Sequence, residues 1–365
     1  MNILYIANHL NVGGITSYVL TLATGLKKRG HEVHIASSGG QLLSRFQEAG
    51  INYIHIPIKT KSEINPKILV SACKLSSAVK KYNIDIAHSN SRTTQVLGCL
   101  LARFVDIPHI STCHGFFKKK VFRKIFPCWG QKVIAISESV KEHLMKDFAV
   151  REEDIRVIYN GIDMENLKAT SSNLPAEEKK NFGLGEGPVV GILARLSDVK
   201  GHIYLIEAMK NVLEKLPHAQ LLIVGEGKMQ KELVALVNRL GIEKNVFFMP
   251  SVNDTKEVLS IMDLFVMPSL KEGLGLALME AMSSGLPVIG SDVGGIKSLI
   301  QDGYNGLLIK PADSQGLARA IMELLQTPER AKNLGRNARI FINQNFSQEK
   351  MVLETQKLYL ECLPR

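Results

Sequence analysis

The sequence predicts an α/β protein with two doubly wound halves, and two features of the chain support this class. Short apolar segments alternate with amphipathic stretches of helical periodicity along the whole sequence, as in parallel sheets whose strands are joined by helical crossovers. The apolar segments form two series, separated by a polar stretch at residues 169–175 and a glycine-rich stretch at residues 183–188. These two stretches indicate a junction between domains.

The first series begins with a strand–helix–strand unit. Asn2–Ala7 and Glu32–Ser37 are apolar enough for buried strands, and Ile15–Lys28 has the periodicity of an amphipathic helix that ends before Gly30. Further strands are expected at Tyr53–Ile56, Ile84–His88, His109–Thr112, Lys132–Ile136 and Arg156–Tyr159. The first half should therefore form one open parallel sheet.

The second series repeats this plan. Strands are expected at Val189–Leu193, Gln220–Val224, Val246–Met249, Leu264–Met267, Pro287–Gly290 and Gly306–Ile309. Helices are expected through Leu205–Leu213, Met229–Leu240, Gly316–Leu325 and Gln348–Leu363. Ligands of doubly wound sheets bind at the carboxyl ends of the strands, so we expect the site in a cleft between the two halves.

The composition fits a folded protein that stays in the cytoplasm. The chain has 365 residues, of which 45% are hydrophobic and 22% charged, and this length favours two domains. It has no apolar run of the roughly 20 residues that would cross a bilayer, and its start lacks the basic region of a signal peptide. Five cysteines without a C-x-x-C pair argue against a disulfide framework or a zinc site.

The excess positive charge lies in the first half. Residues 1–160 contain 22 Lys and Arg against 11 Asp and Glu, which leaves 23 basic and 24 acidic residues in the remainder. Such a field favours a polyanion, an anionic membrane surface or a phosphorylated substrate. Without a recognition motif, the charge is weak evidence for nucleic acid, and we expect no nucleic-acid partner.

Two segments of the second half suit a phosphorylated sugar. Glu272 lies in a glycine-containing loop between a predicted strand and a helix, and Glu280 lies one turn into that helix, where backbone N–H groups and carboxylates can bind phosphate and sugar hydroxyls. Arg195 and Lys200 follow another strand and can clamp a diphosphate. The alternatives are a solvated loop before an ordinary helix and a solvated turn.

Two features of the first half add weaker signals. Gly13-Gly14 precedes a helix and fits an anion site, but its spacing is not that of a dinucleotide-binding loop. His114 follows a strand end, although a single histidine is more often structural. The sequence has no Walker loop, nucleophile elbow, H-E-x-x-H or D-x-D motif, so phosphate charge would have to be neutralised by Arg195 and Lys200.

Taken together, these segments resemble the family-four retaining glycosyltransferases of the GT-B fold (glycosyl transferases group 1). The resemblance spans nearly the whole chain. Besides the residues above, it rests on Ile136-Ser137-Glu138, on residues 157–163, on Val224-Gly225-Glu226-Gly227, on the seven residues between Glu272 and Glu280, and on residues 285–295. It implies an N-terminal acceptor-side domain at residues 1–165, a donor domain at residues 166–345, and a helix at residues 346–365 that returns to the first domain.

The resemblance also implies roles for individual residues. Arg195 and Lys200 would bind the donor diphosphate, Glu272 the sugar hydroxyls, Glu280 the ribose, and His114 would lie beside the sugar. The remaining donor contacts would be the Gly13-Gly14 loop, the backbone of Gly273, Leu274 and Gly275, and a base site near Val252 and Asn253. Two positions depart from the family pattern, since Pro250 replaces a usual glycine and Ser298 a frequent glutamate.

The implied activity is a retaining, metal-independent hexosyltransferase without a cofactor. The sugar would pass from a nucleotide sugar, with UDP as the expected nucleotide, to a hydroxyl of a lipid-linked or envelope-polysaccharide precursor. The family's commonly proposed route is front-face attack, in which the leaving diphosphate takes the proton of the acceptor. A nucleotide-sugar epimerase and a non-catalytic nucleotide-sugar-binding protein are the alternatives.

A segment of the first half suggests where an acceptor could be met. Residues 116–129 contain five basic residues, four Phe and the Trp. If helical, the segment places Val121, Phe122, Ile125 and Phe126 on one face, the pattern of an interfacial segment. The alternative is a core-facing helix with a solvated basic edge. From the interfacial pattern and its flanking basic residues, we expect a peripheral enzyme on an anionic membrane surface.

Overall fold

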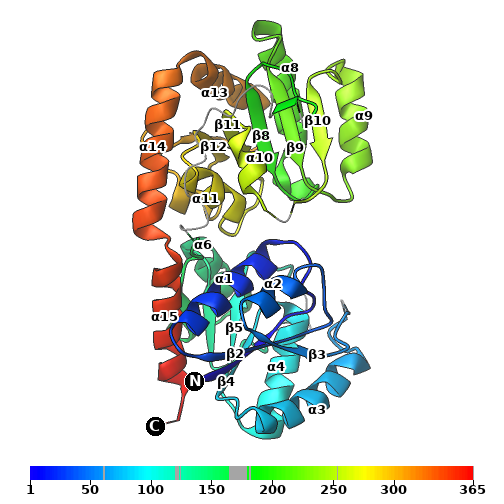
Figure 1. Ribbon diagram of the computed structural model, residues 1–365, viewed down its shortest axis with the longest axis vertical. Helices are drawn as coiled ribbons and strands as arrows, with labels where there is room; N and C mark the ends of the chain where they lie inside the picture. Colours follow the sequence, from blue (N-terminus) through cyan, green and yellow to red (C-terminus); the bar gives the residue numbers. More distant parts are fainter. Residues whose placement is uncertain are drawn as a thin grey trace. The chain divides into compact units, whose positions relative to one another are not determined.

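The computed structural model describes residues 1–60, 62–119, 123, 125–163, 179–180, 182–252 and 254–364. The chain divides into two compact units. Unit 1 comprises Met1–Gly161 with Phe346–Arg365, and unit 2 comprises Ile162–Asn345. Each unit is built on its own parallel sheet (Figure 1).

Unit 1 contains a seven-stranded sheet in the order β3-β2-β1-β4-β5-β6-β7. Neighbouring strands are parallel; Ile3, for example, pairs with Val33 on one side and Ile86 on the other. The order reverses between β1 and β4. The strands are β1 (Asn2–Ile6), β2 (Glu32–Ser37), β3 (Asn52–His55), β4 (Ile86–Ser89), β5 (His109–Cys113), β6 (Lys132–Ala135) and β7 (Ile155–Val157).

Helices cover both faces of this sheet. One face packs on residues of α1, α2 and α15, and the other on residues of α3 and α4, which explains why the inner strands β1, β2, β4 and β5 are buried along nearly their whole length. The helices of unit 1 are α1 (Gly14–Lys28), α2 (Leu43–Glu48), α3 (Pro66–Lys81), α4 (Arg92–Val105), α6 (Glu138–Phe148), the 3₁₀ turn η1 (Glu152–Asp154) and α15 (Gln348–Cys362).

The C-terminal helix α15 packs against α1 within unit 1. Gly25 leaves room for this contact, because a Cβ there would lie 2.4 Å from Val352 Cγ2. The Gln348 side chain donates to the carbonyl of Thr21 (2.6 Å). The Tyr359 hydroxyl lies 2.7 Å from that of Tyr5 on β1, so the end of the chain completes the core of unit 1.

Unit 2 contains a six-stranded parallel sheet in the order β10-β9-β8-β11-β12-β13, which reverses between β8 and β11. Its strands are β8 (Val189–Leu193), β9 (Gln220–Val224), β10 (Val246–Met249), β11 (Leu264–Met267), β12 (Val288–Ser291) and β13 (Leu307–Ile309). Its helices are η2 (Asp198–Lys200), α8 (His202–Lys215), α9 (Gln230–Leu240), α10 (Lys256–Ser260), α11 (Leu276–Ser283), α12 (Ile296–Leu299), α13 (Ser314–Gln326) and α14 (Pro328–Asn345).

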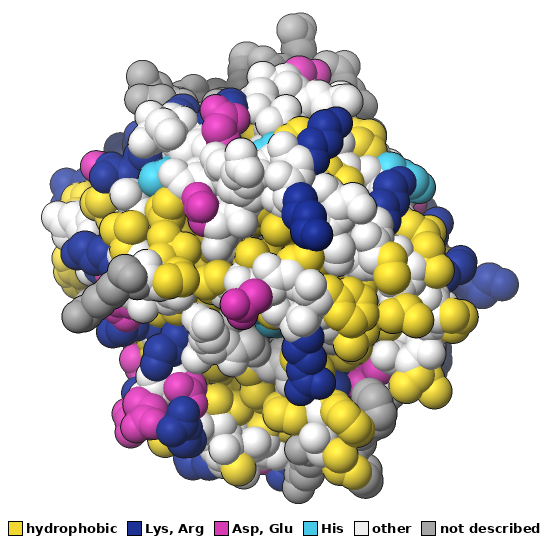
Figure 2. Space-filling view, turned by 90° about the horizontal axis from the view of Figure 1, so that it is seen from below, with side chains coloured by type: hydrophobic (Ala, Val, Ile, Leu, Met, Phe, Trp, Pro, Cys, Tyr) yellow, Lys and Arg dark blue, Asp and Glu magenta, His cyan; other side chains and the backbone are white. Residues whose placement is uncertain are grey.

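These two sheets confirm the predicted fold class. Every strand expected from the sequence has a counterpart whose ends differ by no more than two residues, a difference within the usual uncertainty of strand ends. Figure 2 shows basic side chains spread over one face of the molecule, with acidic and hydrophobic ones among them. Within the described ranges, no helix has both the length and the apolar character needed to cross a membrane.

Candidate functional site

The candidate donor site of unit 2 lies at the point where its strand order reverses. β8 and β11 are neighbours in the sheet although β9 and β10 lie between them in the sequence. Ligands of doubly wound sheets bind outside the carboxyl ends of two such strands. Arg195 and Lys200 follow β8, and Glu272 follows β11. The topology therefore places three of the predicted site residues after the two strands that flank this point.

Lys200 and Glu272 form an ion pair. The Lys200 Nζ donates to Glu272 Oε2 at 2.5 Å, and the hydroxyl of Ser269 donates to the same oxygen at 3.3 Å. The side chains are 21% and 12% exposed, respectively. An ammonium group has three N–H donors, so this pair leaves Lys200 able to bind an anion at the same time.

The loops that carry this pair pack directly on each other. Gly201 has a φ of 73°, and a Cβ there would lie 1.9 Å from the carbonyl oxygen of Pro268. The N–H of Leu270 donates to the carbonyl of Val199 at 2.8 Å. Because the contact is between backbones, the positions of Lys200 and Glu272 do not depend on their own side-chain interaction.

Arg195 lies in a second tight backbone contact. A Cβ on Gly225 would lie 2.1 Å from the carbonyl oxygen of Ala194, and one on Gly227 would lie 2.1 Å from that of Leu196. The N–H of Leu196 donates to the carbonyl of Glu226. These contacts hold the loop on both sides of Arg195, whose side chain is exposed and can reach a ligand.

The loop at residues 272–275 leads into the amino end of α11. Gly275 is the residue before the helix, in a left-handed conformation, and the first turn contains no acidic residue. The loop packs on Gly295, where a Cβ would lie 2.2 Å from the carbonyl oxygen of Gly273, and the N–H of Gly295 donates to the carbonyl of Glu272. A helix start of this kind exposes backbone N–H groups toward an anion or a sugar oxygen.

Glu280 lies one turn into α11, beside the segment that follows β10. Burial and the charge of Asp254 raise the pKa of Glu280 to about 7, against a hydrogen bond with the Thr255 side chain that lowers it. Val252 belongs to the same segment and is partly buried, whereas the predicted base-site residue Asn253 lies outside the described residues. The structure therefore brings the predicted ribose residue close to the segment predicted to hold the base.

A second set of residues lies within unit 1, after the ends of β1, β4 and β5. Gly13 precedes α1, Gly14 is its first residue, and a Cβ on Gly13 would meet no described atom within 4 Å. His114 follows β5; its Nε2 lies 3.2 Å from Asn90 Oδ1, and its ring meets the edge of Tyr18 at 4.6 Å between centroids. Burial lowers the pKa of His114 to about 3, so its imidazole is neutral at pH 7. It can then donate one hydrogen bond and accept another without carrying charge.

Four residues in these groups were not predicted. Asn90 and Ser269 come directly after β4 and shortly after β11, so the rule that ligands bind at strand ends could have found both. Thr255 and Tyr18 contact Glu280 and His114 from other elements, and no local pattern marks them.

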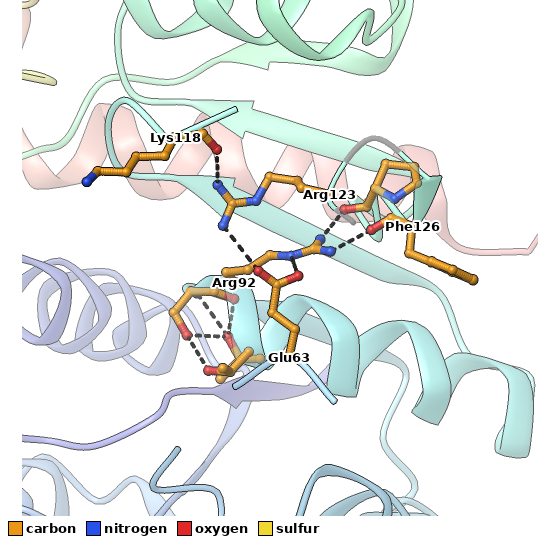
Figure 3. A network of polar contacts seen from close by, with 9 residues as sticks. Glu63, Arg92, Lys118, Arg123 and Phe126 are labelled. Atoms are coloured by element: carbon orange, nitrogen blue, oxygen red, sulfur yellow. Dashed lines mark hydrogen bonds and ion pairs between the residues drawn. The ribbon is translucent and has the colours of Figure 1, made fainter. Parts of the chain in front are cut away.

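The segment after His114 differs from its predicted arrangement. Arg123, predicted as a surface cation beside an interfacial face, is buried: its guanidinium lies 3.8 Å from Glu63, covers the Phe117 ring at 4.3 Å and donates to the carbonyl of Lys118. Figure 3 shows this network, in which Arg92 also binds Glu63 at 2.8 Å. Removing one member of a buried ion pair typically costs roughly 3–5 kcal/mol, which makes Arg123 a structural residue.

Some of the remaining predicted residues of this segment are exposed, and others lie outside the described residues. Ile125 and Phe126 are exposed at 64% and 54%, and Lys118 and Lys119 are exposed as well. Lys119 pairs with Asp147 at 2.7 Å. The predicted positions Lys120, Val121, Phe122 and Lys124 lie outside the described residues. Over the part of the chain that the structure describes, no three His, Cys, Asp or Glu side chains cluster in a way that could hold a metal ion.

Comparison with known proteins connects both units to one family. The profile described as "Glycosyl transferases group 1" matches residues 175–341, and that of "Glycosyltransferase Family 4" matches residues 12–166. N-acetyl-alpha-D-glucosaminyl L-malate synthase of Bacillus anthracis is 28% identical over 367 residues, covering 97% of this chain and 95% of that protein.

Two further proteins are similar over most of their length. UDP-Gal:alpha-D-GlcNAc-diphosphoundecaprenol alpha-1,3-galactosyltransferase of Escherichia coli is 28% identical over 339 residues, covering 88% of this chain and 87% of that protein. The crystal structure of Anabaena HepE in complex with UDP and glucose matches with a TM-score of 0.87 at 25% identity, covering 100% of both chains. Together with the two parallel sheets, these matches show that the chain is a GT-B glycosyltransferase of the group 1 family.

Proposed function

We propose that this glycosyltransferase transfers a hexose, with retention of configuration and without a metal, from a UDP-sugar to a hydroxyl of a lipid-linked or saccharide acceptor. The observation that carries the donor assignment is the Lys200–Glu272 pair at the reversal of strand order in unit 2, with Arg195 on the same loop after β8 as Lys200. The E. coli relative is named for a UDP-galactose donor and a diphosphoundecaprenol acceptor, and HepE was solved with UDP. Both names support the choice of nucleotide, and that of the E. coli relative supports a lipid-linked acceptor.

The residues of unit 2 suit successive parts of a nucleotide sugar. Arg195 and Lys200 are cations that can bind the diphosphate, while Glu272 can accept bonds from sugar hydroxyls beside the N–H groups at the start of α11. Glu280, near the segment containing Val252, suits the ribose. From unit 1, the neutral His114 and the Gly13-Gly14 loop are assigned to the sugar and the diphosphate by the family resemblance.

Transfer would proceed on one face of the sugar. The bond between the anomeric carbon and the diphosphate oxygen breaks while the acceptor oxygen bonds to the same carbon, and the leaving diphosphate takes the acceptor proton. Cations fixed near the leaving group stabilise the charge that develops in the transition state. Arg195 and Lys200 supply the positive charge that a metal ion provides at other diphosphate sites.

The test is release of nucleoside diphosphate from a panel of UDP-, GDP- and ADP-sugars, with undecaprenyl-diphosphate sugars as acceptors and a chelator present. Lys200→Ala should reduce kcat/KM by ~10²-fold or more, because a charge next to the leaving group is lost. Lys332→Ala, at an exposed lysine of α14, is the matched control and should stay within about threefold of wild type.

Four outcomes would contradict separate parts of the proposal. Activity of both Arg195→Ala and Lys200→Ala within about threefold of wild type would remove the donor site assignment. A strict need for added Mg²⁺ or Mn²⁺ would exclude metal independence. Conversion of the donor to its epimer without release of nucleoside diphosphate would support an epimerase, and binding without either reaction would support a non-catalytic protein.

We also propose that the protein docks on an anionic membrane surface from the cytoplasmic side. Its support is the pair of exposed apolar side chains Ile125 and Phe126, which lie in the same segment as the exposed Lys118 and Lys119. Apolar groups flanked by lysines suit the interface of an anionic leaflet, where a lipid-linked acceptor would be found.

A further inference from the structure

A row of four buried hydrogen bonds runs through unit 1. The hydroxyl of Tyr359 lies 2.7 Å from that of Tyr5 and 2.7 Å from Nδ1 of His88. Nε2 of His88 lies 2.7 Å from the hydroxyl of Thr112, which lies 3.2 Å from that of Tyr18. These five residues come from β1, α15, β4, β5 and α1, and none is more than 2% exposed. We call them the Tyr359 network; it connects five elements inside the core.

The number of available protons gives the Tyr359 network a direction. Burial lowers the pKa of His88, so its imidazole is neutral and has one N–H donor and one acceptor nitrogen. If Nδ1 accepts from Tyr359, Tyr359 can accept in turn from Tyr5, and Nε2–H donates to Thr112. The opposite tautomer would leave one of the two tyrosine protons without an acceptor among the described residues, and an unpaired buried donor is unfavourable. Tyr359 is thus the donor that fixes the tautomer of His88.

The Tyr359 network ends beside His114. The ring of Tyr18, whose hydroxyl is bonded to that of Thr112, meets the His114 ring nearly at right angles, with 4.6 Å between centroids and 75° between planes. Nε2 of His114 lies 3.2 Å from Asn90 Oδ1. One contact holds a nitrogen of the imidazole, and the other fixes the ring beside it. A shift of Tyr18 would therefore change the orientation of the His114 imidazole.

We propose that Tyr359 is a positioning residue for sugar transfer. It acts on His114 through the hydrogen bonds of the Tyr359 network and the ring of Tyr18. The inference rests on the assignment of His114 to the donor sugar in the proposed function. The two nitrogens of an imidazole point in directions set by the plane of its ring, so a tilted ring would present its other nitrogen to a different point. The last helix of the chain would thereby contribute to transfer without touching a substrate.

The kinetic test compares Tyr359→Phe in two backgrounds. In the otherwise wild-type protein, loss of the hydroxyl should lower kcat by about tenfold, because a misplaced group at the reacting centre costs rate. UDP binding measured by calorimetry should stay unchanged, since unit 2 keeps its donor residues. In a His114→Ala background, the same change should alter kcat by less than about twofold, because the residue through which it acts is gone. Any loss of thermal stability should be equal in both backgrounds, which separates positioning from a structural effect.

Two further variants support this comparison. Thr112→Val removes the hydroxyl in the middle of the Tyr359 network with little change in volume, and it should reproduce the effect if Tyr359→Phe fails to fold. Tyr53→Phe is the matched control. It removes a tyrosine hydroxyl of the same unit that donates to the carbonyl of Ser37 at 3.1 Å and lies outside the Tyr359 network, so kcat should stay within about twofold of wild type.

Histidine NMR tests the orientation of His114 without a substrate. In protein with isotope-labelled histidine, His88 should be protonated at Nε2, and Tyr359→Phe should shift the imidazole signals of His114 as well as those of His88. Unchanged His114 signals in Tyr359→Phe, or the same fall in kcat with and without the His114 side chain, would overturn the inference. If the wild-type protein releases no nucleoside diphosphate from any donor, the proposed function fails, and the spectra still decide whether Tyr359 orients His114.

Discussion

At the scale of single residues, the surroundings decide the charge of two groups assigned to the donor. His114 is neutral because burial lowers its pKa to about 3, and Glu280 titrates near neutrality because burial and Asp254 raise its pKa to about 7. The histidine is thereby restricted to hydrogen bonding. The Glu280 carboxyl changes its charge between pH 6 and pH 8. Its role can therefore be tested by measuring how donor binding depends on pH.

We expect UDP to bind more tightly at pH 8 than at pH 6, because the ionised Glu280 accepts bonds from the ribose hydroxyls. The ionised fraction of a group with a pKa of about 7 rises about tenfold from pH 6 to pH 8, so the affinity for UDP should change by up to about tenfold. Glu280→Gln should abolish that component. Calorimetry at both pH values, on wild type and variant, measures it. An equal pH dependence in both proteins would contradict the assignment.

The raised pKa of Glu280 also makes the stability of the fold depend on pH. A carboxyl whose pKa is raised by folding keeps a proton that the unfolded chain releases, so its contribution to stability is present below about pH 4.5 and is lost as the pH rises toward 7. Urea unfolding at pH 5 and pH 8 should therefore show a steeper loss of stability in wild type than in Glu280→Gln.

At the scale of elements, glycines position the loops of the candidate donor site. Gly201, Gly225 and Gly295 each lie where a Cβ would come within 2.2 Å of a backbone oxygen of another loop. Backbone cannot move aside as a side chain can, so these loops approach one another only with glycine at the contact. The strand ends thus carry loops whose geometry is fixed by packing before any ligand binds.

We expect Gly295→Ala to reduce the rate of transfer by tenfold or more. The added methyl group would clash with the backbone of Gly273, and overpacking of this kind costs about 1–3 kcal/mol and would displace the 272–275 loop. Its φ is −72°, so alanine is compatible with the local conformation and space is the obstacle. Gly185→Ala, where a Cβ would meet its nearest atom at 3.6 Å, is the control. Kinetics and thermal unfolding of both variants test this; unchanged activity in Gly295→Ala would show that the loop's position is unimportant.

At the scale of the whole molecule, the excess positive charge and the candidate donor site lie in different units. The excess of basic residues falls within residues 1–160, and unit 1 contains the segment with exposed Lys118, Lys119, Ile125 and Phe126. Unit 2 contains the ion pair and helix start assigned to the donor. We propose that surface association and donor binding are separate properties of the two units.

Vesicle co-sedimentation tests this division. Lys118→Ser/Lys119→Ser should weaken binding to anionic vesicles about tenfold or more, since each lysine near an anionic leaflet contributes ~1 kcal/mol. Lys141→Ser/Lys146→Ser on α6 removes the same charge, at lysines that pair with Glu152 and Glu142 as Lys119 pairs with Asp147, and should bind as wild type. Arg123 stays unchanged because it is buried. Equal binding by all three proteins, or by none, would remove this segment from the membrane proposal.

The sequence by itself determined the class of fold, the strands and the family. Strands such as β8 and β11, buried on both faces, are continuously apolar, so each leaves a local pattern that needs no knowledge of its neighbours. The spacing of Glu272 and Glu280 and the stretch around Arg195 and Lys200 are equally local. The roles assigned to these residues stay predictions.

The tertiary structure decided which side chains meet and what charge they carry. Lys200 and Glu272 are 72 residues apart and pair because β8 lies beside β11 in the sheet, an order that no local pattern encodes. The burial of Arg123 on Glu63, the neutral state of His114 and the contact of Thr255 with Glu280 have the same origin. Solvation and electrostatic interactions depend on neighbours in space, and strand order supplies those neighbours.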